Sequence, residues 1–364
     1  MPPVGCGRSC WRGSAGTGTA AGCTPPPFRH PGKINPFLSY AGGSVCPVSS
    51  FEADPEVGPA APATMELLEG APVALGGPRG FAVTRTLPNR GRRMVGAWCF
   101  LDAYGPHDLT GSAGMRVGPH PHTGLQTVTW LVAGEVLHRD SLGNRQEIRP
   151  GQLNLMTAGH GIAHSEETPP EHSPLLQGVQ LWVALPHAAR DMPPAFAHHA
   201  DLPVVTAAGL TATVLMGTLA EATSPARCHT PLVGAELTLS AGAEVSLPLL
   251  PSFEYSVLTL DGAPVIGDVT LKPGPLLYLG SGRATLSLST GSPSRLLLLG
   301  GEPFEERLVM WWNFVARDHD EIVQMRADWS DATPRFGTVR GYDGPALPAP
   351  AMPITRLVPR GRVR

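Results

Sequence analysis

The chain has 364 residues, enough for two domains of ordinary size, and its hydrophobic content of 42% is sufficient for buried cores. Charged residues make up 16% and the formal net charge is -3, which argues against direct binding of nucleic acid through a basic surface. The sequence has no run of 18 uncharged apolar residues, so it predicts neither a transmembrane helix nor a membrane partner.

The first 64 residues differ in composition from the rest of the chain. Of these 64 residues, 21 are Pro or Gly, and no apolar period is visible. Such a stretch buries too little apolar surface to offset the entropy lost on ordering. We therefore expect residues 1–64 to be a disordered extension, or a mis-assigned start upstream of Met65. A transit peptide is the alternative, because no acidic residue precedes Glu52.

The cysteines indicate a reducing compartment. None of the six forms a C-x-x-C pair, so a zinc site built on them is not expected. Cys99 and Cys228 lie far apart in the sequence and are interpreted as small buried hydrophobic residues. We therefore predict a cytoplasmic protein.

Short strands separated by turn residues dominate residues 65–167. Residues 65–117 are predicted to form short strands that lead into a barrel, with 106–108 in a loop and His107 exposed to solvent. Further strands are expected at 126–132, 135–140, 146–148 and 153–156, with Gly, Asn and Pro between them. This pattern is typical of an antiparallel barrel or sandwich.

Two pairs of residues in this region have the spacing of metal ligands on strands. His120 and His122 form one pair, and His164 and Glu166 form the other. Residues i and i+2 of a strand point to the same face, so each pair can direct two ligands into one space. Imidazole and carboxylate suit iron, manganese, nickel, copper or zinc, but not calcium. We therefore expect one metal ion, with open positions for water, dioxygen or a chelating substrate.

The segment that follows is predicted to close the first domain and lead into a second. A strand is expected at 177–185, with Trp182 packed in the core. Residues 187–206 are interpreted as an inter-domain connection, because their prolines restrict helix formation. His198 and His199 are adjacent and would face opposite sides of a strand, so we do not expect them to share a metal.

Residues 207–302 have the same pattern of short strands and turns as the first half. Strands are expected at 214–218, 235–240, 255–260, 276–279 and 294–299. Paired ligands are missing in this half, where His229 stands alone, so this domain is predicted to lack a metal. A helix is then expected after Asp318, which has Glu321 three residues later in a capping-box pattern. The residues after Pro334 are rich in Pro, Gly and Arg and are predicted to form a mobile tail.

The motifs resemble those of the cupins and, within them, the pirins. Pirins have H-P-H early and H-x-E late, as at 120–122 and 164–166 here. The neighbouring sequences Met-Thr-Ala-Gly at 156–159 and Gly-Ile-Ala-His-Ser-Glu at 161–166 are also similar to pirin. The resemblance extends over roughly residues 65–329. The usual cupin carboxylate is replaced by Gln126, and in pirins the later motif supplies the fourth ligand, here Glu166.

The resemblance implies an all-β fold of two tandem jelly-roll barrels, a bicupin, with a short C-terminal helix. Residues 65–190 would form the metal-binding cupin domain and 191–333 a cupin domain without metal ligands, followed by the tail at 334–364. The implied ligands are His120, His122, His164 and Glu166. The implied metal is iron(II), and manganese, nickel and copper remain open.

Two functions of different classes follow from the resemblance. The first is a flavonol 2,3-dioxygenase of the quercetinase type, in which Glu166 would accept the proton of the flavonol 3-hydroxyl and dioxygen would be the second substrate. The alternative is a regulatory protein that acts through protein partners according to the oxidation state of its metal. Three residues are candidates for an outer shell, with solvent exposure as the alternative for each: Gln126, Asn154 and His160.

Overall fold

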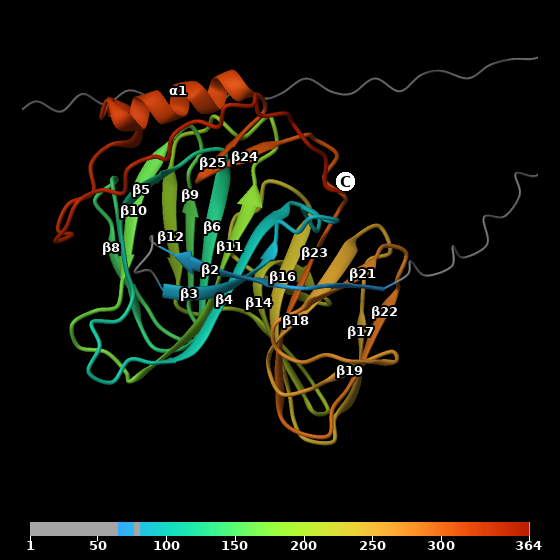
Figure 1. Cartoon of the computed structure of the whole chain (residues 1–364). Helices are drawn as coiled ribbons and strands as arrows, with labels where there is room; N and C mark the ends of the chain where they lie inside the picture. The colour runs from blue at the N-terminus through green and yellow to red at the C-terminus, as the bar shows by residue number, and fades with distance from the viewer. Residues whose placement is uncertain (1–64, 76–80, 364) are drawn as a thin grey trace, which may run out of the picture. The chain divides into compact units, whose positions relative to one another are not determined.

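The computed structural model of the protein describes residues 65–75 and 81–363. The extension predicted over residues 1–64, with four of the six cysteines, lies outside these ranges. The described chain is all-β apart from short helical segments, and it folds as two tandem cupin barrels (Figure 1). The fold class predicted from the sequence is thereby confirmed.

The first barrel consists of two facing sheets. Its larger sheet has the strand order β12 (Ala195–His199), β9 (Leu153–Thr157), β6 (Leu125–Ala133), β11 (Leu175–Ala184), β4 (Trp98–Asp108), β3 (Phe81–Leu87) and β2 (Ala71–Leu75). Its smaller sheet has the order β5 (Arg116–His122), β10 (Ile162–Glu167), β7 (Val136–Asp140) and β8 (Arg145–Ile148). All pairings are antiparallel, as the short turn-linked strands predict.

The second barrel repeats this arrangement. Its larger sheet has the order β1 (Glu66–Leu68), β21 (Leu276–Gly280), β18 (Glu254–Asp261), β23 (Ser294–Gly301), β16 (Leu232–Leu239), β14 (Leu210–Leu219) and β13 (Val204–Ala207), and β15 (Ala222–Thr223) pairs with β14. Its smaller sheet has the order β17 (Glu244–Pro248), β22 (Thr285–Ser289), β19 (Val265–Ile266) and β20 (Val269–Thr270). Each strand predicted between residues 207 and 302 lies at one of these strands.

Two strand pairings cross the domain boundaries drawn from the sequence. β1 pairs with β21, so residues 66–68 join the sheet of the second barrel. β12 pairs with β9, so the first barrel continues beyond residue 190 to His199. The segment interpreted as a connection thus contains a strand, because its prolines precede β12 and leave its backbone N–H groups free to pair.

Two tryptophans of the first barrel connect it to the second. The indole N–H of Trp98 donates to the carbonyl oxygens of Val233 and Gly300, at 3.1 Å each. The indole N–H of Trp130 donates to the Glu236 carboxylate at 2.7 Å. One buried apolar cluster includes side chains from both barrels, so burial of apolar surface supports this contact as well as hydrogen bonds.

The C-terminal part of the chain packs on one end of the first barrel. β24 (Val309–Trp311) and β25 (Phe314–Ala316) form a hairpin, and helix α1 (His319–Ser330) lies close to it (Figure 1). The Asp318 carboxylate accepts hydrogen bonds from two backbone N–H groups of the first turn, as predicted for an N-cap. A short 3₁₀ helix, η1 (Pro334–Phe336), follows.

The tail after residue 336, predicted to be mobile, makes hydrogen bonds with earlier parts of the chain. Leu347 N–H donates to the Pro119 carbonyl at 2.8 Å, and Arg360 exchanges backbone hydrogen bonds with Leu308 at 2.9 Å. Arg362 pairs with Glu254, a side chain buried in the second barrel, at 2.8 Å. Because Pro-rich chain makes few internal hydrogen bonds, its ordering here depends on contacts with the barrels.

His107 lies on a strand, and the two described cysteines are not paired. Residues 106–108 belong to β4, so the predicted loop at His107 is wrong, and its ring lies within 2.9 Å of the Ala82 carbonyl. Cys99 is buried and Cys228 is half-buried, and both are free thiols.

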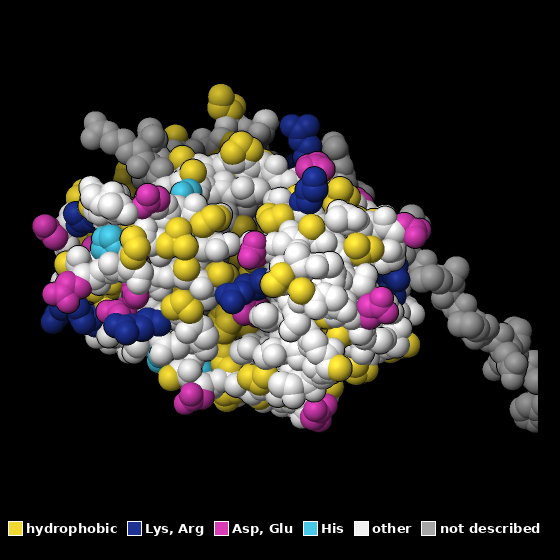
Figure 2. Space-filling model, turned by 90° about the horizontal axis from the view of Figure 1, so that it is seen from below, with side chains coloured by type: hydrophobic (Ala, Val, Ile, Leu, Met, Phe, Trp, Pro, Cys, Tyr) yellow, Lys and Arg dark blue, Asp and Glu magenta, His cyan; other side chains and the backbone are white. Residues whose placement is uncertain are grey.

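No helix in the described ranges is long and apolar enough to cross a bilayer. On the face in Figure 2, the coloured basic side chains are interspersed with acidic ones.

Candidate functional site

Three neighbouring strands of the smaller sheet in the first barrel carry the polar side chains of the site. In the pairing of β10 with β5, His164 lies opposite His120. In the pairing of β10 with β7, His164 lies opposite Asp140 and Glu166 lies opposite His138. Each strand thus contributes residues at positions i and i+2, which the pleat directs to one face of the sheet. The two-residue period within each strand and the register between the strands together bring these side chains to one face of the sheet.

Three of the four residues singled out in the sequence converge. His120, His122 and His164 each offer a ligand atom, and these atoms lie within 4.8 Å of one another. Their ring centroids are 4.4 to 5.0 Å apart, and all three side chains are buried. Three imidazoles this close in a barrel interior form a candidate metal centre.

Backbone carbonyls determine the tautomers of two of these rings. Nδ1 of His120 lies 2.9 Å from the Gly118 carbonyl, and Nδ1 of His122 lies 3.2 Å from the Asn313 carbonyl. A carbonyl oxygen only accepts hydrogen bonds, so each Nδ1 must carry the proton and donate. Nε2 of each ring is then left with a free lone pair, which is the form that binds a metal.

Burial keeps these imidazoles neutral. It lowers the pKa of His120 to about 4, against the opposing effect of the hydrogen bond to Gly118. Burial and the neighbouring imidazoles hold the pKa values of His122 and His164 well below the usual value. Nε2 of His164 is buried without a hydrogen-bond partner among the described residues. An unpaired buried acceptor is costly, and a bound cation would satisfy it.

Glu166 lies in a second group rather than with all three histidines. Its carboxylate, His164 and His138 offer ligand atoms within 4.8 Å of one another. Burial raises the pKa of Glu166, and Thr129 donates a hydrogen bond of 3.3 Å to its Oε1. The Thr129 hydroxyl is also 3.0 Å from Oε1 of Gln180. A buried carboxylate with a raised pKa is suited to accept a proton.

His138 is the residue of the site that the sequence analysis missed. It lies on β7, where 135–140 was predicted to be a strand, and it forms an H-x-D pair with Asp140. The spacing is the same as in the two pairs that were recognised, so the signal was present. The proposed outer-shell residues point elsewhere: Gln126 bonds to Thr157 and Arg227, Asn154 to His198, and His160 to Met192.

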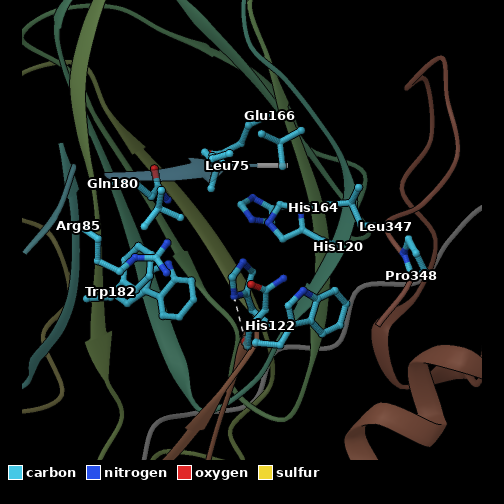
Figure 3. Close-up of a pocket in the computed structure, with 16 residues that line it drawn as sticks. Leu75, Arg85, His120, His122, His164, Glu166, Gln180, Trp182, Leu347 and Pro348 are labelled. Carbon is cyan, nitrogen blue, oxygen red and sulfur yellow. Dashed lines mark hydrogen bonds between the residues drawn. The ribbon is translucent and has the colours of Figure 1, made fainter. Parts of the chain in front are cut away.

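A cavity of about 620 Å³ opens in front of the three histidines and Glu166. In Figure 3, Arg85, Gln180 and Trp182 lie on one side of the histidines, and Leu347 and Pro348 lie on the side of His120. Trp182 is buried, as predicted, and its ring also lines the cavity. The volume and the mix of apolar and polar lining residues are those of a site for a small molecule.

Comparison with known proteins identifies the family. A family model described as Pirin matches residues 80–183, and one described as the Pirin C-terminal cupin domain matches residues 234–337. The chain belongs to the pirin family. In this pirin, the first match lies within the first barrel and includes the residues of the candidate metal centre. The second match covers most strands of the second barrel and continues through α1 and η1.

Relatives of this pirin carry two kinds of name. A putative quercetin 2,3-dioxygenase of Pseudomonas aeruginosa is 49% identical over 274 residues, which cover 75% of this chain and 87% of the relative. A pirin-like protein of Caulobacter vibrioides is 38% identical, with 68% of this chain and 88% of the relative covered. The crystal structure of a quercetin 2,3-dioxygenase from Acinetobacter baumannii is 43% identical, with a TM-score of 0.77 and coverage of 80% and 96%.

Proposed function

We propose that this pirin is a metal-dependent dioxygenase of the quercetin 2,3-dioxygenase type, acting on a flavonol-like aromatic substrate. The observation that carries the proposal is the convergence of three buried, neutral histidines at the base of an apolar cavity. One relative at 49% identity is named a putative quercetin 2,3-dioxygenase and one solved structure at 43% identity a quercetin 2,3-dioxygenase, which supports the same reaction class.

The donor set fits a transition-metal ion. His120, His122 and His164 would hold it through ring nitrogens, and Glu166 would supply the fourth ligand after a modest movement of its side chain. The unpartnered Nε2 of His164 supports this assignment. Imidazole and carboxylate suit iron(II), which we propose as the metal, with one ion per chain. When bound, the ion would supply a Lewis acid and a place for a chelating substrate and dioxygen to meet.

The chain's own residues would bind the substrate and move one proton. The cavity is large enough for a flavonol, whose rings would pack against Trp182, Phe100 and the aliphatic wall. Glu166 would accept the proton of the substrate 3-hydroxyl, since burial raises the pKa of its carboxyl toward that of a general base. Thr129, which donates to Glu166, would hold the carboxylate in place for this transfer. Dioxygen would then add across C2 and C4 of the flavonol.

Dioxygen uptake in the presence of quercetin tests the proposal. The protein would be loaded anaerobically with iron, manganese, nickel or copper, and its metal content measured before uptake is recorded. We expect uptake that is proportional to bound metal, accompanied by loss of the flavonol absorbance. His187→Ala is the matched control for variants of the ligands, because His187 is exposed. No uptake with any of the four metals, quercetin or related flavonols would overturn the proposal and favour the regulatory alternative.

A further inference from the structure

The residues His138 and Asp140 form a hydrogen-bonded chain that ends on His164. Nε2 of His138 lies 3.2 Å from Oδ2 of Asp140, and Nδ1 of His138 lies 3.3 Å from Nδ1 of His164. All three side chains are buried. We propose that His138 and Asp140 are positioning residues, which hold the His164 ring in the tautomer whose Nε2 is free to bind the metal.

The chain of hydrogen bonds starts at a fixed carboxylate. Oδ1 of Asp140 accepts from the backbone N–H of Leu142 at 2.9 Å and of Asn144 at 3.1 Å. The side-chain amide of Asn144 donates to both carboxylate oxygens, at 3.1 and 2.9 Å. These donors require a carboxylate that accepts, so Nε2 of His138 must be the donor of the remaining bond. The turn after β7 thereby holds the Asp140 end of this series of hydrogen bonds in place.

The donor and acceptor roles then propagate to His164. With its proton on Nε2 for Asp140, His138 has the tautomer that we propose, in which Nδ1 accepts. The bond between the two Nδ1 atoms therefore requires that His164 carries its proton on Nδ1. Nε2 of His164 is left with a lone pair and has no partner among the described residues. His164 thus has the same tautomer as His120 and His122, whose Nδ1 atoms bond to carbonyls.

These bonds distinguish a positioning role for His138 from a role as a ligand. Its ligand atom lies within 4.8 Å of those of His164 and Glu166, so these three residues are an alternative group of metal ligands. Both of its ring nitrogens are already occupied, one by Asp140 and one by His164. Its ring also stacks on Phe196, with centroids 4.5 Å apart and planes inclined by 14°, which fixes the ring plane. His138 therefore has no free lone pair to offer a metal.

The inference rests on the proposed metal site but not on the proposed reaction, so metal affinity is the first test. Nickel(II), which is stable in air, would be titrated by calorimetry into the metal-free protein. We expect His138→Phe, which retains the stacking partner of Phe196, to weaken nickel binding by about 10–100-fold, the usual cost of losing an outer-shell partner. His138→Asn places a side-chain oxygen where Nδ1 stood and should restore most of the affinity. His172→Phe is the control, because His172 bonds only to the Ser173 carbonyl among the described residues.

Two further results distinguish failure of the positioning role from failure of the proposed metal site. Equal nickel binding by the unmodified protein and by His120→Ala would show that nickel does not bind at the proposed site. Normal binding by His138→Phe, with loss of binding in His120→Ala, would leave the site intact and overturn the positioning role. A second ion that binds the unmodified protein but not His138→Phe would also overturn it, because His138 would then be a ligand.

A direct reading of the tautomers keeps the inference testable if His138→Phe does not fold. In metal-free protein labelled with ¹⁵N-histidine, NMR shifts report which ring nitrogens carry protons. We expect His164 to be protonated at Nδ1 and His138 at Nε2 only, with signals assigned through the single variants. A proton on Nε2 of His164 would overturn the proposal, because the chain of bonds would then run in the opposite direction.

Discussion

The indole of Trp182 stacks on the ring of Phe100, with ring centroids 3.9 Å apart and ring planes inclined by 11°. The Arg85 guanidinium lies over the Phe100 ring at 4.4 Å, and Oδ1 and Oδ2 of Asp102 accept from the same guanidinium at 2.8 Å. The edge of Trp182 meets His122, with centroids 5.2 Å apart. This stack thus joins the wall of the cavity to one of the candidate ligands.

Removal of the indole should therefore destabilise the barrel. For Trp182→Ala we expect a loss of about 3 kcal/mol in the free energy of unfolding, as for other buried aromatic residues. Trp182→Phe should lose less, because a ring can still stack on Phe100. Urea denaturation of the metal-free proteins measures both values. An alanine variant with the midpoint of the unmodified protein would show that the stack contributes little.

Loss of one imidazole should lower metal occupancy. His122→Ala removes a candidate ligand outright, so the metal content of purified protein should fall sharply from about one ion per chain. Elemental analysis of His122→Ala beside His187→Ala measures the effect. Two tightly bound ions per chain in the unmodified protein would contradict the expectation of a metal-free second domain.

Glu166→Gln tests the proposed proton transfer. The amide oxygen can still coordinate weakly, but it does not accept a proton at neutral pH. We expect the variant to keep some metal and to lose flavonol-dependent dioxygen uptake per bound metal by about 10²–10⁴-fold. Glu171→Gln, at an exposed position, is the control. Unchanged uptake per bound metal would leave Glu166 as a ligand only.

The metal-free protein should be sensitive to mild acid. The pKa of His120 is about 4 in the folded state, whereas that of an unfolded histidine is about 6.5. The unfolded state therefore binds more protons below pH 6.5, and stability falls as the pH is lowered from about 6.5 to 4. For this residue alone the loss is about 3 kcal/mol. Urea midpoints between pH 7 and 4 should fall more steeply for the unmodified protein than for His120→Gln, and equal slopes would contradict the prediction.

The start of the folded body can be tested by truncation. A chain that begins at Met65 keeps β1, and we expect it to melt within a few degrees of the full chain. A chain that begins at Gly70 lacks the pairing of β1 with β21 and the buried side chain of Leu68. It should lose about 2 kcal/mol, the usual contribution of one buried leucine. Calorimetric melting of the three proteins measures this difference, and a loss of cooperativity on starting at Met65 would show that the preceding residues stabilise the fold.

Local patterns predicted much of the fold and of the site. The strand period predicted that His120 and His122 share a face, and the capping-box pattern predicted Asp318 as the N-cap of α1. The H-x-D spacing at 138–140 is visible in the sequence, but the contact of His138 with His164 depends on the register of β7 with β10, which a single strand does not reveal. The pairing of β1 with β21 joins segments about two hundred residues apart, so no local signal reports it.

The cavity wall contains Leu347 and Pro348, which follow the second barrel in the sequence. During synthesis, the three histidines are therefore added to the chain well before this part of the wall. N-terminal domains generally fold first during synthesis. A nascent first barrel would present its histidines before Leu347 bonds to Pro119. The three histidines are thus complete in the nascent chain before Leu347 and Pro348 take their places in the wall of the cavity.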